Sequence, residues 1–189
     1  MSNICKNFSD EAQDGINRLC NLYIHGEYVM NSLLYFFHRH DVALCKIACF
    51  FKRVSYIKCS KMEDLMTYQN LRGGELVFQK IQKPPKAKWN SAFKAFEFLL
   101  DFEKQTHDEL LKVHKIAVHH NDFHLRDWLG TNFLCDMVKH LEELGWIVTN
   151  LRRVGTGTGE FVFEEQYFKE PLKIHTMRNS MDTAYAQVQ

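Results

Sequence analysis

Two long apolar patterns at the start of the chain constrain its fold more than any other feature. Apolar residues recur every three or four positions over 10–39 and again over 41–72, which predicts two amphipathic helices. Because only a short connection separates them, we expect these helices to pack as antiparallel neighbours. The apolar face of the second helix is interrupted by Lys58 and Lys61. Two ammonium groups that point into a helix bundle are costly unless carboxylates pair with them.

A long link over 75–88 separates the second helix from a third helix, predicted over 90–120. Pro84 and Pro85 prevent the third helix from starting before the end of the link. A link of this length can span a whole bundle, so we expect the third helix to run parallel to the second. Glu103 lies in the middle of the apolar face of the third helix.

The last part of the chain predicts a fourth long helix and a short fifth one. The fourth, over 124–153, has the most regular heptad pattern of the chain, formed by Leu134, Met137, Leu141, Leu144, Val148 and Leu151. The glycine-rich stretch 155–159 lacks the lysine of a phosphate-binding loop and is interpreted as a hinge. We expect a short fifth helix within 160–169. If this helix docks on the bundle, its apolar side chains would be Phe161, Val162, Phe163, Tyr167 and Phe168.

These patterns predict a single all-α domain over 9–170. Residues 1–8 are an extension without the features of a signal peptide, and 171–189 has too few apolar residues to pack, so we expect a disordered tail. No apolar run approaches the roughly 18 residues of a membrane span. Lys and Arg total 24 against 23 Asp and Glu and are spread along the chain, so nucleic-acid binding is not predicted.

The six cysteines indicate reduced thiols, because a chain with a helical core of this size does not need a disulfide framework. This usage favours a cytoplasmic location. Cys45 and Cys49 lie one turn apart and could bind a soft metal, but half-buried thiols explain them better. The group of His119, His120 and His124 is likewise better explained as a solvated helix end than as a zinc site.

Several motifs occur in a fixed order along the chain. They are AxxxINRxxNL (12–22), DVAL (41–44), LMxxQNxRGG (65–74), KP followed by W (83–89), LLxxHKxA (110–117), NDxHLxD (121–127) and ELGxxVTNLRR (143–153). Through them, residues 12–168 resemble an animal ferritin subunit, closest to the heavy-chain type. The resemblance implies an up-down-down-up four-helix bundle with one long crossover and a short fifth helix. It also implies assembly with other ferritin subunits into a hollow shell of 24 that stores iron as a ferric mineral.

The resemblance further implies where an iron-oxidising site would lie. Heavy-type subunits use a Glu and a nearby Tyr on helix one, Glu-x-x-His on helix two, a Glu on helix three and a Gln on helix four. The corresponding positions here are Tyr23, Met30, Lys58, Lys61, Glu103 and Met137. Only Glu103 is retained, and protonated lysines supply no lone pairs to a metal. We therefore expect no intact di-iron site and no ferroxidase activity.

A buried ion-pair group is the better explanation of the lysines. We expect Lys58 to pair with Glu103, as a lysine at the corresponding place does in light-type ferritins. Glu27 is a possible partner for Lys61.

Two further regions depart from what the resemblance implies. Threefold channels of the family carry an Asp and a Glu one turn apart. Asp127 is retained here, but the Glu position is Gly130, and Arg126 adds a cation. We therefore expect weakened iron entry. His114 matches a channel-region histidine, although a core or interface residue explains it better.

The surface that nucleates mineral in light-type subunits also has few acids here. Its residues are Arg53, Tyr56, Ile57, Ser60, Glu63 and Asp64. The function predicted from the sequence is thus that of a non-catalytic iron-storage shell subunit that assembles with active subunits. The alternative is a diverged four-helix interaction protein that is no longer part of an iron shell. Contacts with neighbouring subunits, expected at Asn21, Arg72, the link 76–81 and the fifth helix, distinguish the two.

Overall fold

The computed structural model describes residues 5–85 and 88–168, and all regular secondary structure within them is helical. Four helices are long: α1 (Asp10–Phe37), α2 (Cys45–Leu71), α3 (Ala92–His119) and α5 (Cys135–Val154). Three elements are short: α4 (Phe123–Leu129), the π-helical turn η1 (Gly130–Leu134) and α6 (Thr158–Tyr167). The expected tail, 171–189, lies outside the described residues.

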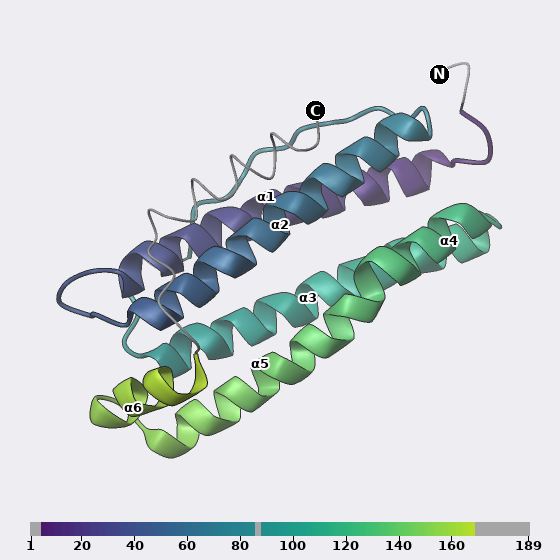
Figure 1. Cartoon of the computed structure of the whole chain (residues 1–189). Helices are drawn as coiled ribbons and strands as arrows, with labels where there is room; N and C mark the ends of the chain where they lie inside the picture. The colour runs from purple at the N-terminus through teal and green to yellow at the C-terminus, as the bar shows by residue number, and fades with distance from the viewer. Residues whose placement is uncertain (1–4, 86–87, 169–189) are drawn as a thin grey trace, which may run out of the picture.

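The long helices form the up-down-down-up bundle that the sequence predicted (Figure 1). α1 and α2 are antiparallel neighbours, α3 runs in the direction of α2, and α4, η1 and α5 return antiparallel to α3 (Figure 1). The link after α2 has no helix and returns along α1. Asn17 Nδ2 donates to the carbonyl oxygen of Glu75 at 3.0 Å, and the His25 ring lies 3.1 Å from the carbonyl oxygen of Gln82. These contacts hold the crossover against the bundle.

The connection between α1 and α2 is longer than predicted. α1 ends at Phe37, and α2 begins at Cys45 instead of Asp41. Asp41 is held in the turn by Arg39, whose Nε lies 2.9 Å from its Oδ1. Ala43 has a φ of 52°, a left-handed conformation that no α-helix accommodates. These two local features delay the start of α2.

The predicted fourth helix is divided by the π turn. η1 holds one extra residue within its turn, so it rotates the face of the helix that points inward. Leu134 and Leu141 of the predicted heptad are only partly buried, whereas Ile147, outside that heptad, is fully buried. The heptad pattern therefore predicted only some of the residues that α5 buries.

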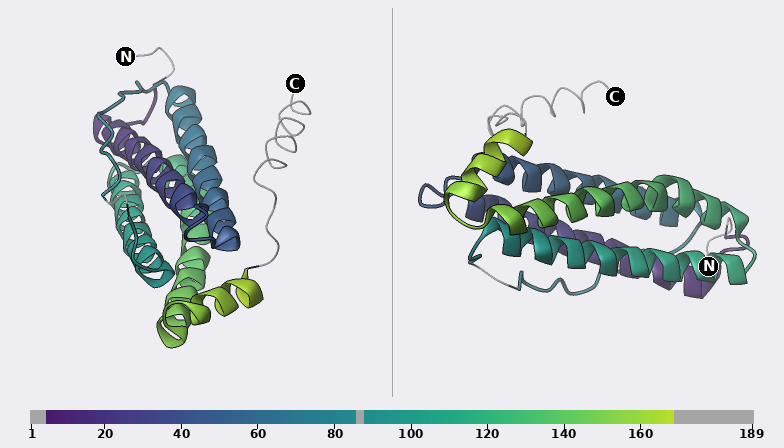
Figure 2. Two further views of the ribbon diagram at one scale, coloured as in Figure 1. Left: turned by 90° about the vertical axis from the view of Figure 1, so that its left-hand side faces the viewer. Right: turned by 90° about the horizontal axis from the view of Figure 1, so that it is seen from below.

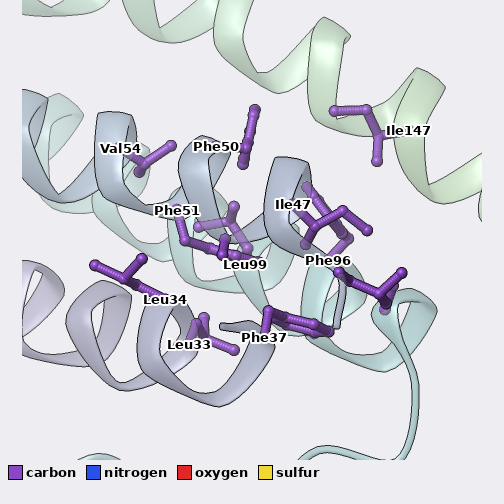
Figure 3. Packing of buried hydrophobic residues seen from close by; sticks show 14 of the residues in the cluster. Leu33, Leu34, Phe37, Ile47, Phe50, Phe51, Val54, Phe96, Leu99 and Ile147 are labelled. Carbon is purple, nitrogen blue, oxygen red and sulfur yellow. The ribbon is translucent and has the colours of Figure 1, made fainter. Parts of the chain in front are cut away.

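The core consists of two apolar clusters, one toward each end of the bundle. The cluster nearer α6 is rich in phenylalanine (Figure 3). Phe37 and Phe51 stack with ring centroids 5.5 Å apart, and the Phe96 ring lies 5.1 Å from Phe51. The second cluster surrounds Leu65 and Leu110 at the α4 end. The layer between the clusters contains the buried charges described below.

The short helix α6 lies across the end of the bundle where α3 begins (Figure 2). Only some of its apolar side chains pack against the bundle. Phe168, directly after the helix, is buried and Phe163 packs against the core, but Phe161 and Val162 are exposed by 54% and 44%. The residues of α6 that are buried are instead Glu160 and Glu164.

Both buried carboxylates of α6 serve as caps for other helices. Glu160 Oε1 accepts a hydrogen bond from the backbone N–H of Ala92 at 2.8 Å, at the start of α3. Glu164 Oε1 accepts from the N–H groups of Lys46 and Ile47, at 2.6 and 3.0 Å, at the start of α2. The first N–H groups of a helix lack partners within it, so these contacts explain why acidic residues are buried here.

Candidate functional site

The expected ion pair between Lys58 and Glu103 is present at the centre of the bundle. Lys58 Nζ on α2 lies 2.7 Å from Glu103 Oε2 on α3. The two side chains are exposed by only 4% and 1%. The ammonium group therefore lies beside the carboxylate to which the resemblance to heavy-type ferritins assigned a metal-binding role.

Two aromatic rings form the walls around the Lys58 ammonium. Its Nζ lies 4.7 Å from the ring centroid of Tyr23 and 5.4 Å from that of Phe102, within the range of cation–π attraction. Burial, with a smaller contribution from the charge of Glu103, raises the pKa of Tyr23 far above its usual range. Tyr23 is therefore a neutral phenol, and its ring stabilises the Lys58 ammonium group.

Lys61 does not pair with Glu27, and that prediction is wrong. Its side chain is 21% exposed and reaches from α2 across to the π turn and the start of α5. There Nζ donates to the carbonyl oxygen of Asn132, lies 3.3 Å from Asp136 Oδ2, and sits 5.1 Å from the Phe133 ring centroid. The heptad pattern did not predict the π turn, so it could not predict that Lys61 contacts residues of η1.

Glu27 instead belongs to a group with Cys59 and Glu63. Burial, with the charge of Glu63 as the next cause, raises the pKa of Glu27 above its ordinary value. Cys59 Sγ lies 4.0 Å from Glu63 Oε1. This group is separate from the charges in the centre of the bundle.

A groove of about 460 Å³ opens between α2 and α5, next to the central ion pair. Its lining includes Tyr23, Lys58, Lys61, Glu103 and Met137. The structure thus brings together five of the six positions that the resemblance assigned to an iron-oxidising site. Met30, the remaining position, is fully buried in the apolar cluster on the α6 side.

His140 also lines this groove, and the sequence reading missed it. Its Nε2 lies 3.9 Å from Glu103 Oε1, and its Nδ1 lies 3.8 Å from Glu143 Oε2. Burial, more than any other cause, lowers the pKa of His140 below its ordinary value, so the imidazole is neutral at pH 7. Its position one turn after Met137 was the signal that could have found it.

One atom of the site lacks a hydrogen bond. Glu103 Oε2 is paired with Lys58, but Glu103 Oε1 is buried and receives no donor among the described residues. A buried carboxylate oxygen without a donor has a considerable desolvation cost.

The donor set of the groove does not fit a pair of iron ions. Lys58 and Lys61 present ammonium groups, which repel a cation and offer no lone pairs while protonated. Tyr23 and Met137 offer a neutral phenol and a thioether where the resembled site has oxygen ligands. Over 5–85 and 88–168, no three or more His, Cys, Asp or Glu side chains are grouped so that they could hold a metal ion.

The expected channel residues lie at the start of the fourth helical segment. Arg126 and Asp127 form an exposed ion pair, with Arg126 Nη2 2.8 Å from Asp127 Oδ1. A Cβ atom at Gly130 would meet nothing within 4 Å, so a larger residue fits there. His114 is half-buried on α3. Arg72, expected at a subunit contact, is engaged within the chain by Asp122, with Nη2 and Oδ2 2.9 Å apart.

The fold and the central buried charges define a ferritin-like four-helix-bundle protein. A sequence model described as the ferritin-like domain matches residues 13–154, and relatives match most of the chain, so the chain belongs to the ferritin family.

Three relatives illustrate this membership. The chain is 39% identical to soma ferritin of Lymnaea stagnalis over 161 residues, which cover 85% of this chain and 92% of that protein. It is 40% identical to the oocyte isoform of ferritin light chain of Xenopus laevis over 167 residues, covering 87% and 94%. It is 36% identical to the ferritin middle subunit of Aquarana catesbeiana over 173 residues, covering 90% and 98%. Iron storage is thus the general role of its relatives.

Over the described residues, none of the helices has both the length and the apolar character of a bilayer span.

Proposed function

We propose that this chain is a wall subunit of a cytoplasmic ferritin shell and that it has no ferroxidase activity of its own. In this role it assembles with iron-oxidising subunits into a 24-subunit shell, and it lowers the number of oxidising sites in each shell. The stored ferric iron is cargo of the assembly and is not held at the centre of this subunit.

The observation that carries this proposal is the 2.7 Å contact between Lys58 Nζ and Glu103 Oε2. The ammonium group neutralises the retained carboxylate and takes a place where a cation would otherwise bind. Lys61 adds a second positive charge at the edge of the same groove. Two iron ions would have to bind against both charges, at a site with a single retained ligand.

Exposed apolar side chains support the assembly part of the proposal. Tyr28 on α1 is 51% exposed, and Val77, Phe78 and Ile81 on the adjoining link are exposed by 54%, 71% and 40%. A surface of large apolar side chains on α1 and the crossover fits contact with neighbouring subunits.

Oxidation of Fe²⁺ by the purified protein tests the catalytic part. We expect no rapid phase with a stoichiometry of paired irons per chain. The matched gain-of-function variant carries Tyr23→Glu, Lys58→Glu, Lys61→His and Met137→Gln, which restores the heavy-type ligands around Glu103, and it should show such a phase. A rapid paired-iron phase in the unmodified protein would overturn the proposal.

Native mass spectrometry tests the assembly part. The chain expressed together with a heavy-type subunit should give mixed shells that contain both. A chain that stays monomeric alone and also fails to enter mixed shells would instead indicate the diverged interaction protein.

A further inference from the structure

The phenol of Tyr68 on α2 belongs to a hydrogen-bonded network at the α4 end of the bundle. Arg72 Nη1 donates to the phenolic oxygen at 2.6 Å, and His124 Nδ1 on α4 lies 2.9 Å from the same oxygen. Asp122 holds the Arg72 guanidinium through both of its carboxylate oxygens, at 3.1 and 2.9 Å. Because Tyr68 is only 2% exposed, its hydroxyl proton needs an acceptor within this network.

The network directs the phenolic proton toward His124. A guanidinium group has donors only, so Arg72 cannot accept this proton. His124 Nδ1 is the other partner of the phenolic oxygen, at a distance typical of a hydrogen bond. If Nδ1 carried a proton instead, the buried hydroxyl hydrogen would lack an acceptor among the described residues, which is costly. The hydrogen bond therefore runs from Tyr68 to His124.

The Tyr68 ring stacks on the indole of Trp128. The two ring centroids are 4.1 Å apart, with an angle of 24° between the planes. Trp128 is half-buried, so it has a contact with solvent that Tyr68 lacks. Indole and phenol lose one electron more readily than the other aromatic side chains, and electrons pass rapidly between stacked rings. Trp128 can therefore connect the buried phenol to an oxidant at the surface.

The protonation state of Tyr68 couples the electron to a proton. Burial raises the pKa of Tyr68 to about 12, although the hydrogen bond from Arg72 opposes this rise. Tyr68 is thus a neutral phenol at pH 7. A phenol that has lost an electron is a strong acid, so its proton must leave together with the electron.

We propose that Tyr68 is a proton-coupled redox site, which gives one electron through Trp128 to an oxidant and its phenolic proton to His124. The oxidant is a one-electron oxidant at the surface of the chain, such as hydroxyl radical, which is reduced to hydroxide. The O–H bond of Tyr68 breaks, and an N–H bond forms at His124 Nδ1. The products are a neutral tyrosyl radical, an imidazolium group and the reduced oxidant.

The surroundings of Tyr68 favour a long-lived radical. The ring is buried between Phe8 and Trp128, and the phenolic oxygen keeps its hydrogen bond from Arg72. An oxidising equivalent that reaches Trp128 is thus held at one buried residue and does not spread to other side chains. This property belongs to the chain itself, needs no bound metal and goes beyond the proposed role in a shell.

Flash photolysis of the purified full-length protein with tris(bipyridine)ruthenium and persulfate tests the inference, because the photogenerated Ru(III) complex is a one-electron oxidant. Electron paramagnetic resonance should detect a neutral tyrosyl radical that lives at least tenfold longer than any radical of the Tyr68→Phe variant. Tyr28→Phe is the matched control, because Tyr28 is a 51% exposed tyrosine, and it should retain the long-lived signal. A long-lived tyrosyl radical in Tyr68→Phe, or none in the unmodified protein, would overturn the inference.

The His124→Gln variant tests the proton acceptor. It retains a hydrogen-bond acceptor but has no basic nitrogen, so radical formation should slow at least tenfold, since a positioned proton acceptor accelerates transfer by about 10²-fold or more. His119→Gln is the control, because His119 is another exposed histidine and stacks on His120 instead. In the unmodified protein the radical should form about twofold more slowly in D₂O. An unchanged rate in His124→Gln would overturn the role of His124, and the network would then only connect α2 to α4.

The Trp128→Phe variant tests the electron route. It keeps an aromatic ring against Tyr68, but phenylalanine is much harder to oxidise, so formation of the Tyr68 radical should slow at least tenfold. Trp146→Phe is the control, because Trp146 is 64% exposed on α5, and it should leave the rate unchanged. Equal rates for Trp128→Phe and the unmodified protein would overturn the role of Trp128. Neither Fe²⁺ oxidation nor shell assembly enters these measurements, so this inference and the proposed function fail separately.

Discussion

The Nζ atom of Lys58 lies 2.7 Å from Oε2 of Glu103, in the layer between the two apolar clusters of the core. Neither charge has substantial contact with solvent. Each of the two charges can be buried because the other neutralises it. The ion pair also connects α2 to α3 at this point.

Replacement of one member of this pair should therefore destabilise the protein strongly. Lys58→Met leaves the Glu103 carboxylate buried without its cation, and we expect a loss of about 3–5 kcal/mol in the free energy of unfolding. Urea denaturation followed by circular dichroism measures this loss.

Two further variants serve as controls. The double variant Lys58→Met with Glu103→Leu removes both charges and should recover most of the loss, because an apolar pair can replace a buried ion pair at little cost. Lys61→Met should cost at most about 1 kcal/mol, because the Lys61 ion pair is partly exposed. A double variant as unstable as Lys58→Met alone would show that the pair does not act as a unit.

The long helices and their order could be predicted because apolar periodicity reports directly on the buried face of each helix. Their ends could not, because local chemistry sets them. The contact between Arg39 and Asp41 and the left-handed Ala43 delay α2, and neither changes the apolar pattern.

The apolar faces predicted that Lys58 needs a buried carboxylate, and the resemblance to light-type ferritins indicated that this carboxylate is Glu103. The partners of Lys61 depend on η1, which no apolar pattern revealed. The burial of Glu160 and Glu164 depends on backbone N–H groups of distant helices. Because every residue type has the same backbone N–H group, except proline, the spacing of residue types could not predict these contacts.

The cap that Glu164 provides for α2 should contribute measurably to stability. Leu44 precedes α2 and offers no side-chain cap, so Glu164 is the side chain that accepts from the first N–H groups. Glu164→Ala should lower the free energy of unfolding by about 0.5–2 kcal/mol. Glu165→Ala, at a neighbouring exposed position of α6, is the control and should have a smaller effect, measured by the same denaturation.

The same carboxylate predicts a pH dependence. Burial raises the pKa of Glu164 above its ordinary value of 4.5, so the folded state retains this proton to higher pH than the unfolded state. The protonated Glu164 therefore stabilises the folded state. This stabilisation is complete below pH 4.5 and is lost as the pH rises through the raised pKa. Glu164→Gln keeps an acceptor oxygen but cannot ionise. It should therefore gain stability relative to the unmodified protein as the pH rises above 4.5, and a difference that stays constant with pH would contradict this assignment.

A carboxylate introduced at Gly130 should accelerate iron uptake by the shell. The position has space for a side chain and lies one turn after Asp127, whose charge Arg126 now neutralises. Gly130→Glu adds negative charge at the proposed channel and should raise the uptake rate about tenfold at low ionic strength. Gly145→Glu is the matched control, because a Cβ atom at Gly145 also meets nothing within 4 Å. Equal rates for the two variants, measured as ferric iron formed in mixed shells, would exclude Gly130 from the entry route.

The thiols should differ sharply in reactivity. Cys20 is 5% exposed, and burial raises its pKa to about 12, so roughly one thiol in 10⁵ is ionised at pH 7. Cys135 is exposed at the start of α5. An alkylating reagent followed by peptide mass mapping should therefore modify Cys135 in the folded protein and reach Cys20 only after unfolding in urea. Because the thiolate is the reactive species, fast modification of Cys20 in the folded protein would mean that α1 opens locally at the site beside Tyr23.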